Sequence, residues 1–283
     1  MTHASPIPEI RPGQSIELLK ELHILTHEGK LNQDTRRKLK QVYHLYQFIE
    51  PLLAQVLESK PTITLADHGA GKSYLGFILY DLFVNVARRQ PSALHITGIE
   101  TRAELVDKSR ELAARLGFEH MAFFNLSVQG SIDSPDVSPH IDVVTALHAC
   151  DTATDDTIAF GLHKQARHMV LVPCCQAQVA GVLRQHKALS LKRTPLAELW
   201  RHPLHTREFG SQITNVLRCL QLQAHGYAVT VTELVGWEHS MKNELIIASR
   251  LEKGREAAAA QARERLQQLL QELQLDELAQ RFA

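Results

Sequence analysis

The feature that most constrains the fold of this chain is a run of β-branched and apolar residues that ends in an acid and two closely spaced glycines. It occupies residues 62–74 and reads T-I-T-L-A-D-H-G-A-G-K-S-Y. A strand, a glycine turn and a helix in this order are how a parallel sheet presents backbone N–H groups to a bound cofactor. The sequence therefore predicts an α/β fold with a ligand at the end of its first strand.

Two kinds of site fit this glycine turn. Residues 66–73 also match a relaxed P-loop, which needs an acid at the end of a second apolar strand to organise Mg²⁺. The later apolar runs at 141–146 and 168–172 do not end in an acid. A nucleoside site instead needs an acid at the end of the next strand to bind ribose hydroxyls, and the run 94–100 ends in Glu100. The pattern favours a nucleoside site over a triphosphate site.

Length and composition set the class of protein. A chain of 283 residues with 44% hydrophobic content suits one sizeable globular domain with helical additions. Lys and Arg together equal Asp and Glu at 31 each, so the whole-chain charge indicates no partner. We expect a cytoplasmic protein without a membrane span, because the sequence lacks long apolar runs and a signal-peptide pattern and its four cysteines do not form a disulfide framework.

Strand-like and helix-like segments alternate along the chain, which is typical of a doubly wound parallel sheet. The stretch from 175 to about 209 is expected to be irregular, and the two closing strands, with no helix between them, are expected to pair antiparallel. The prediction is a Rossmann-like, seven-stranded, mostly parallel sheet whose last strand is antiparallel, with added N-terminal helices and a C-terminal helix. The expected strands are 63–67, 94–100, 121–125, 141–146, 168–172, 228–234 and 245–249, and the expected helices are 16–25, 38–57, 73–88, 103–116, 155–165, 211–225 and 250–278.

Three regions are expected along the chain. Residues 1–60 form an N-terminal helical region, residues 61–250 form the sheet domain, and residues 251–283 form an amphipathic helix. Within the sheet domain, residues 184–209 are expected to be an insertion on the substrate side. The C-terminal helix is expected to pack on its own domain or to make a dimer contact, so the oligomeric state stays open between monomer and homodimer.

Four ordered motifs carry a resemblance to a known family. They are D-H-G-A-G-K-S-Y-L at 67–75, L-H-A-C-D-T-A-T-D at 147–155, V-P-C-C-Q at 172–176 and E-H-S-M-K-N at 238–243. Together they resemble class I S-adenosylmethionine-dependent methyltransferases. The resemblance is to a methyltransferase-like family related to ribosomal RNA adenine dimethylase domain-containing proteins and to a tRNA 2′-O-methyltransferase branch, and it covers about residues 36–249. Relatives often read Cys-Gly-Asp where this chain has Cys150-Asp151-Thr152.

The resemblance implies S-adenosylmethionine as the cofactor, bound over the glycine turn. Asp67 would face the ammonium end, Glu100 would bond the ribose hydroxyls, and Asn125 would lie near the adenine edge. The glycines let the backbone approach the ligand without an intervening Cβ. The cofactor-binding residues implied are Asp67, Gly69, Gly71, Lys72, Ser73, Glu100, Thr101, Asn125, Leu126 and Leu147.

Catalysis and substrate binding are implied for the loops after the fourth and fifth strands. Methyl transfer requires an aligned nucleophile and, where a proton must leave, a base, which His148 or Asp151 could supply. Equally, His148 could pack locally and Asp151 could simply begin the next helix. Cys174 and Cys175 are predicted to be buried or to face the substrate. No metal is predicted, because adjacent cysteines without a second pair are poor zinc ligands.

A local basic segment points to RNA as a possible partner. Residues 184–207 carry six Lys and Arg side chains against one acid, together with Trp200. Cations interleaved with an aromatic ring could hold phosphates and stack a base, and Arg193 and Arg201 are the predicted substrate contacts. A second cluster spans residues 36–40. A solvated basic face is the alternative interpretation of both clusters.

The sequence thus predicts a cytoplasmic S-adenosylmethionine-dependent methyltransferase acting on RNA, either tRNA or rRNA. A methyltransferase for a small molecule or a protein is the first alternative. A catalytically inactive, cofactor-binding, RNA-associated protein is the second, because the Cys150-Asp151 motif departs from the family pattern.

Overall fold

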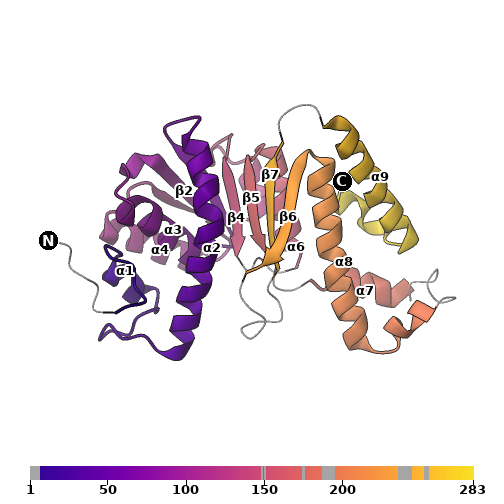
Figure 1. The fold of residues 1–283 in the computed structure, drawn as a ribbon, viewed down its shortest axis with the longest axis horizontal. Helices are drawn as coiled ribbons and strands as arrows, with labels where there is room; N and C mark the ends of the chain where they lie inside the picture. Colours follow the sequence, from indigo (N-terminus) through magenta and orange to yellow (C-terminus); the bar gives the residue numbers. More distant parts are fainter. Residues whose placement is uncertain are drawn as a thin grey trace.

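The computed structural model describes residues 7–147, 149, 151–173, 176–186, 195–234, 244–251 and 255–283. Its centre is one seven-stranded sheet in the order β3-β2-β1-β4-β5-β7-β6 (Figure 1). The strands are β1 Ile63–His68, β2 Leu94–Glu100, β3 Met121–Asn125, β4 Val143–Leu147, β5 His168–Val172, β6 Tyr227–Glu233 and β7 Glu244–Arg250.

The pairing within the sheet confirms the predicted fold class. β1 to β5 pair in parallel, whereas β7 runs antiparallel to both β5 and β6. Asp67 lies opposite Gly98 on β2 and opposite Thr145 on β4, and Glu100 lies opposite Asn125 on β3. The carboxyl ends of the first four strands therefore meet at one edge, which we call the carboxyl edge.

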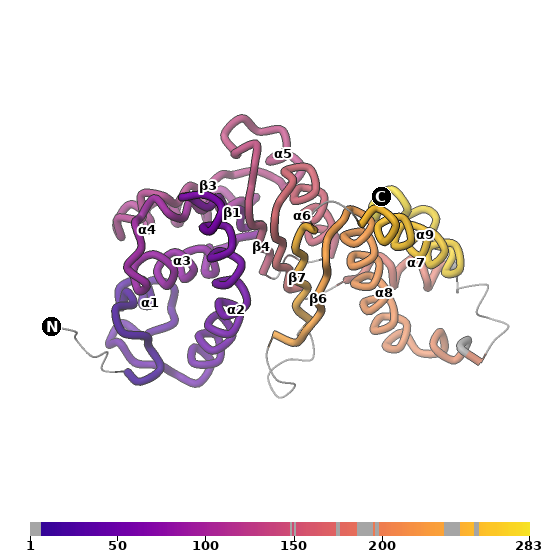
Figure 2. The backbone as a smooth tube through the Cα atoms, turned by 45° about the horizontal axis from the view of Figure 1, so that its top comes forward, coloured from indigo at the N-terminus to yellow at the C-terminus, as the bar shows by residue number. Residues whose placement is uncertain are grey.

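Two groups of helices lie towards the two ends of the sheet. The group from α1 to α4 lies beside β1, β2 and β3, while α7, α8 and α9 form a second group beyond β6 (Figure 2). The bounds are α1 Ile16–Glu21, α2 Gln33–Leu57, α3 Tyr74–Tyr80, α4 Ala103–Leu116, α5 Val128–Ile132, α6 Thr152–His163, α7 Gln178–His186, α8 Pro203–Ala224 and α9 Glu256–Glu272, with a π-helix at Asp81–Val86 and 3₁₀ turns at Pro91–Ala93, Pro195–Trp200 and Asp276–Arg281.

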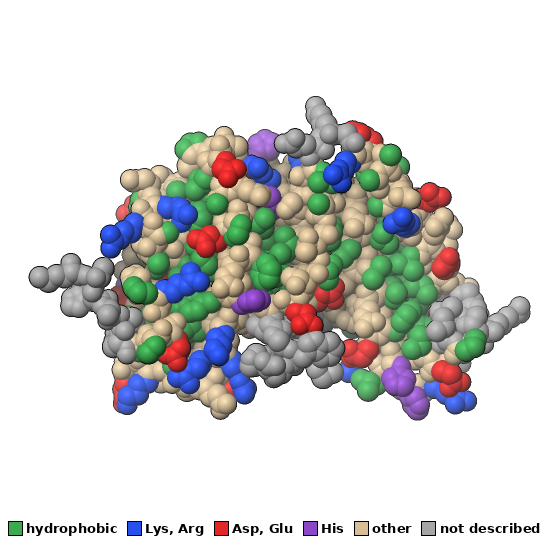
Figure 3. All heavy atoms as spheres, viewed as in Figure 1, with side chains coloured by type: hydrophobic (Ala, Val, Ile, Leu, Met, Phe, Trp, Pro, Cys, Tyr) green, Lys and Arg blue, Asp and Glu red, His purple; other side chains and the backbone are tan. Residues whose placement is uncertain are grey.

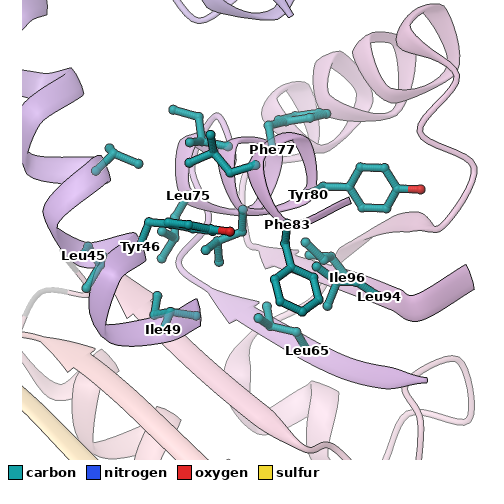
Figure 4. Packing of buried hydrophobic residues seen from close by; sticks show 14 of the residues in the cluster. Leu45, Tyr46, Ile49, Leu65, Leu75, Phe77, Tyr80, Phe83, Leu94 and Ile96 are labelled. Atoms are coloured by element: carbon teal, nitrogen blue, oxygen red, sulfur yellow. The ribbon is translucent and has the colours of Figure 1, made fainter. Parts of the chain in front are cut away.

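Each face of the sheet has its own hydrophobic core because successive side chains of a strand point to opposite faces. Leu65 joins the cluster under α2, α3 and α4, whereas its neighbour Ala66 joins the cluster under α6. Figure 4 shows the first cluster, in which Tyr46 and Ile49 of α2 approach Leu75 of α3. The N-terminal helices therefore share their core with the sheet.

Helix α2 begins earlier than the predicted residue 38. Its start is fixed by a capping box, in which the Asn32 side chain accepts from the Thr35 N–H at 2.9 Å and the Thr35 hydroxyl accepts from the Asn32 N–H at 3.1 Å. The first turn is polar and mostly exposed, so apolar spacing alone could not reveal it.

The prediction of an irregular stretch from 175 to about 209 is wrong. Helix α7 begins at Gln178, and α8 begins at Pro203, where a proline suits the first turn of a helix. Val179, Val182 and Leu183 of α7 pack with Leu217 of α8 and Leu266 of α9 in a third cluster. The apolar stripe of α7 is short, and it becomes recognisable only when its partner helices are in place.

Other predicted elements also differ from the structure. The expected helix 73–88 contains α3 followed by a π-helix from Asp81 to Val86, and the expected helix 250–278 divides into α9 and a 3₁₀ turn after β7 ends at Arg250. Helix α5 was not predicted and begins at the cap Ser127, whose hydroxyl accepts from the Gly130 N–H.

Two long helices extend past the carboxyl edge. At 1.5 Å per residue, the 25 residues of α2 span roughly 37 Å and the 22 residues of α8 roughly 33 Å, against about 20 Å for the strands. Both helices lead into strands at the opposite edge, so their N-terminal ends project beyond the carboxyl edge, at the bottom of Figure 1. Among the described residues, none of the helices combines the length and apolar character of a bilayer span.

Candidate active site

The glycine turn follows β1 directly and uses left-handed backbone. Gly69 and Gly71 have φ values of 61° and 57°, which a residue with a Cβ adopts only with strain. A Cβ added at Gly69 would lie 3.8 Å from Ala149, so the turn passes beside the loop that follows β4. The first and second sequence motifs are thus neighbours at the carboxyl edge.

Asp67 lies in β1, directly before this turn, and is buried. Its carboxyl is 2% exposed, and it accepts hydrogen bonds from the Thr145 hydroxyl at 2.7 Å and from the backbone N–H of Gly76. Burial raises the pKa of Asp67 to about 7, although both hydrogen bonds act to lower it. The residue expected to face the ammonium end of the cofactor therefore ties β1 to β4 and α3.

Glu100 lies at the end of β2, beside the turn. The Gly71 N–H donates to its Oε2 at 2.8 Å, and the Arg102 side chain donates from Nε to Oε1 at 3.0 Å and from Nη2 to Oε2 at 3.1 Å. Burial acts to raise the pKa of Glu100, but the hydrogen bonds from Arg102 and Gly71 outweigh it and lower the pKa to about 2. Glu100 is therefore ionised and rigidly placed.

The remaining adenosine-side candidates gather around Glu100. The Thr101 hydroxyl donates to Oε1 of Glu100 at 3.3 Å. The Asn125 side chain and the Leu126 N–H both donate to the Glu100 carbonyl, at 3.1 and 3.2 Å. The structure thus brings together the predicted residues from the ends of β1, β2 and β3, and Leu147 ends the neighbouring β4.

Lys72 and Ser73 point in different directions. Ser73 is fully buried, and its own backbone is in the left-handed region. Among the described residues, its hydroxyl has no hydrogen-bond partner. Lys72 is exposed and lines a groove with His23 and with Lys108 and Arg115 of α4. The lysine of the P-loop pattern therefore lies at a groove beside α4.

Asp151 is the one predicted catalytic residue that the structure describes. Its backbone is strained, with φ of 49° and ψ of −119°, and its Oδ1 accepts from the N–H groups of Ala177 and Gln178 at 2.9 and 3.3 Å. The carboxylate thus joins the loop after β4 to the start of α7. One of its two oxygens is committed to this contact, so its predicted role as a base stays a prediction.

The predicted substrate residues are described only in part. His148, Cys174, Cys175 and Arg193 lie outside the described residues. Arg201 is exposed and pairs with Glu198 at 3.1 Å, just before α8. Among the described residues, no group of His, Cys, Asp and Glu side chains has the arrangement of a metal site.

Sequence reasoning missed a buried polar cluster behind these loops. Arg218 of α8 is 1% exposed and donates to Asp155, to Asn215 and to the carbonyl of Asp151. Asn215 also accepts from Gln176, the last residue of the V-P-C-C-Q motif. Asn and Arg three residues apart on the inner face of a helix were the available signal.

The strand order, the glycine turn and the acid that ends β2 define a class I methyltransferase fold. The residues fit an adenosyl ligand for two reasons. The glycines have left-handed backbone and no Cβ, so a ligand can approach the turn near Ala149, and the ionised carboxylate of Glu100 lies at the end of the neighbouring strand. A ribose would share that carboxylate with Arg102. S-adenosylmethionine is the cofactor of this class.

Comparison with known proteins places the chain in a family. The chain belongs to the methyltransferase domain family, whose model matches residues 37–182. This membership resolves the two interpretations of the glycine turn in favour of the nucleoside site. No curated protein matches the chain.

Three solved structures with a similar fold are distant from this chain in sequence. Magnesium protoporphyrin IX methyltransferase from Synechocystis PCC 6803, solved with bound SAH, is 13% identical, with a TM-score of 0.46 over 83% of this chain and 93% of that one. The CurJ carbon methyltransferase is 19% identical, with a TM-score of 0.44 over 73% and 54%. The methyltransferase domain of bacterial CtHen1 is 12% identical, with a TM-score of 0.44 over 74% and 100%.

Proposed function

We propose that this chain is a cytoplasmic S-adenosylmethionine-dependent methyltransferase that acts on RNA, either tRNA or rRNA. The observation that carries the proposal is the position of two exposed basic clusters. One lies on the N-terminal end of α2 and the other at the start of α8, and both helix ends project past the carboxyl edge that bears the glycine turn.

The two clusters flank the same edge from opposite sides. In Figure 3, blue side chains gather at the lower left and purple and blue side chains at the lower right, where these helix ends lie. An anionic backbone that reached the turn could contact cations on both sides. The exposed members are Arg36, Arg37, Lys38 and Lys40 at α2, and Arg201, His202, His205 and Arg207 at α8.

Acidic neighbours partly balance these cations. Arg36 pairs with Glu9 at 2.8 Å, Arg201 pairs with Glu198, and Arg207 pairs with Glu208, both at 3.1 Å. Exposed pairs of this kind contribute only about 0–1 kcal/mol, so the guanidinium groups can exchange a carboxylate for a phosphate at small cost.

The cofactor part of the proposal is tested by calorimetric titration with S-adenosylmethionine, S-adenosylhomocysteine and Mg-ATP. We expect both adenosyl ligands to bind and ATP not to bind. Binding of ATP alone would overturn the assignment of the glycine turn.

The acceptor is tested by transfer of a labelled methyl group from the cofactor to RNA, protein and small-molecule fractions. We expect label in RNA. Reversal of Lys38 and Lys40, or of Arg201 and Arg207, to Glu should weaken RNA binding about tenfold or more and flatten its salt dependence, because each lost phosphate contact lowers the slope.

The matched control reverses Arg255 and Arg265 near and within α9, which begins at the opposite edge of the sheet. This control removes the same charge and should leave RNA binding unchanged. Label in a small-molecule or protein fraction, with unchanged RNA binding in both basic variants, would favour the alternative acceptors. Cofactor binding without transfer to any fraction would indicate an inactive protein.

A further inference from the structure

Helix α8 directs one polar face into the molecule. Ser211, Asn215 and Arg218 stand four and then three residues apart, so they share a face of the helix. Asn215 and Arg218 are 4% and 1% exposed, and this side of α8 also carries buried apolar residues such as Leu217 and Leu222. Buried polar groups on a packing face need specific partners.

Arg218 holds the loop between β4 and α6. Its Nε donates to Oδ1 of Asp155 at 2.5 Å, and its Nη2 donates to the carbonyl of Asp151 at 2.8 Å. Arg218 therefore contacts a residue whose backbone is strained, and such conformations persist only where the surroundings hold them.

The same loop is fastened to the loop after β5. Oδ1 of Asp151 accepts from the N–H groups of Ala177 and Gln178, so it caps the start of α7. The Thr154 hydroxyl donates to the carbonyl of Ala149 at 2.7 Å, which fixes the residue beside Gly69.

Asn215 connects two further segments. Its Oδ1 accepts from Nε2 of Gln176 at 3.0 Å and from Nη1 of Arg218 at 3.0 Å, and its Nδ2 donates to Glu244 at 2.6 Å. Ser211 completes the bonding of Gln176 by donating to its Oε1 at 2.6 Å. Glu244 is the first residue of β7.

One helix thus fixes three segments of the chain: the loop after β4, the loop after β5 and the start of β7. All three lie at the carboxyl edge, because β4 and β5 end there and the antiparallel β7 begins there. Three of the four sequence motifs adjoin these contacts. The motif at 147–155 ends at Asp155, the motif at 172–176 ends at Gln176, and the motif at 238–243 directly precedes Glu244.

We propose that Ser211, Asn215 and Arg218 are positioning residues for methyl transfer, acting through Asp151, Gln176 and Glu244 on the loops that receive the acceptor. This inference rests on the methyltransferase function proposed above. Within the described part of the chain, no hydrogen bond or ion pair joins these three residues to the glycine turn or to Glu100, so we expect them to set the geometry of the acceptor side and not that of the cofactor side.

The choice of polar contacts has a physical reason. An apolar helix face would pack as well or better, because the desolvation of a buried ion pair offsets much of its attraction. Arg218, however, provides directional bonds to a side chain and to a carbonyl at once, and a fully bonded network fixes a single arrangement. Misplacement of reacting groups by about 1 Å can cost a factor on the order of 100 in rate.

The test compares Asn215→Ala, Arg218→Lys and the milder Ser211→Ala with the control Thr214→Val. Thr214 is on the same helix, is buried, and donates only to the carbonyl of Gly210 in its own helix. Arg218→Lys keeps the charge beside Asp155 but loses the planar fork. We expect S-adenosylhomocysteine affinity to stay within about twofold in all variants, while methyl transfer to the labelled fraction falls about 10- to 100-fold in Asn215→Ala and Arg218→Lys.

Peptide-resolved hydrogen exchange provides a readout that needs no substrate. Exchange in residues 151–156 and 176–180 should accelerate about tenfold or more in Asn215→Ala and Arg218→Lys, with β1 and β2 unchanged. If the wild-type protein transfers no methyl group, the proposed function fails and the exchange result still decides the positioning. Unchanged exchange in both segments, or equal losses in Thr214→Val, would overturn the inference, as would transfer that falls only in parallel with cofactor affinity. Should the two stronger variants not fold, Ser211→Ala decides by the same criteria, with a smaller expected effect.

Discussion

Glu100 and Arg102 show how single residues set the chemistry of the cofactor site at the carboxyl edge. Both carboxylate oxygens of Glu100 already accept hydrogen bonds from Arg102, and Arg102 is itself 58% exposed. A carboxylate has about four acceptor positions, so a ribose diol must compete with the guanidinium for them.

We therefore predict opposite effects of two substitutions on S-adenosylhomocysteine affinity. Glu100→Gln should weaken binding about tenfold or more, because the amide cannot accept on both of its atoms. Arg102→Ala should tighten binding about two- to fivefold, because it removes a donor that competes with the ribose for the Glu100 carboxylate. Calorimetry gives both values, and weaker binding in Arg102→Ala would instead make Arg102 part of the cofactor site.

Asp67 is predicted to make stability depend on pH near neutrality. The pKa of about 7 in the folded protein exceeds the ordinary value of about 3.9, so the folded state holds a proton that the unfolded state releases between these values. The contribution of this carboxyl is fully present below pH about 4 and is lost as pH rises to about 7.

Asp67→Asn should remove this dependence while keeping an oxygen to accept from Thr145. The free energy of unfolding of the wild type, relative to the variant, should therefore fall by a few kcal/mol from pH 5 to pH 7.5 in urea titrations. Burial lowers the pKa of His68 to about 3, so the contribution of His68 to the free energy of unfolding is lost as pH falls below about 6.5, which is the opposite direction. The comparison with the variant cancels this contribution, because His68 is present in both proteins. A pH-independent difference would show that Asp67 is ionised throughout.

At the scale of the elements, the glycine turn depends on its backbone conformation more than on space. A Cβ on Gly71 would meet Nη2 of Arg102 at 3.7 Å, an ordinary contact, yet the φ of 57° penalises any side chain. The turn was found from the sequence because glycines are the usual residues at such positions.

Gly71→Ala should lower the free energy of unfolding by about 1–2 kcal/mol and weaken cofactor binding. The control is Gly181→Ala in α7, where nothing lies within 4 Å of an added Cβ and the backbone is helical. That change should be neutral or should stabilise by about 0.5–1 kcal/mol. Chemical denaturation measures both variants, and equal effects would contradict the role assigned to the backbone of the turn.

The elements that the sequence predicted well are those with strong local signals. β2, β3, α4 and β5 were found with the observed bounds, because β-branched or helical spacing and a clear terminator, such as Gly117 in left-handed backbone, mark them. Helix α7 was missed because its apolar stripe covers only three residues and needs α8 and α9 to be buried.

At the scale of the whole molecule, the N-terminal helices are part of the sheet's own core. Leu18, Leu19 and Ile24 are fully buried in the same cluster as Leu65 and Ile96. Ser15 adds a polar link, since its N–H donates to the buried Asp81 at 3.0 Å.

Leu19→Ala should therefore destabilise the entire protein. We expect a loss of about 2–5 kcal/mol with a single unfolding transition. Tryptophan fluorescence, to which Trp200 in the distant cluster with Phe209 contributes, and far-UV circular dichroism should report the same lowered midpoint. A second transition confined to one probe would mean that the N-terminal region unfolds independently.

The sequence by itself determined the sheet, the glycine turn, the acid at the end of β2 and the class of protein, because each depends on residues close together in the chain. Only the tertiary structure decided where Asp67 and Arg102 direct their side chains and how α8 fixes the loops after β4 and β5. Arg218 and Asp155 are 63 residues apart, and Gln176 and Asn215 are 39 apart, so no local pattern specifies their contacts. Those pairings arise because burial leaves a charged or amide side chain no partner except the few polar groups that packing brings within reach.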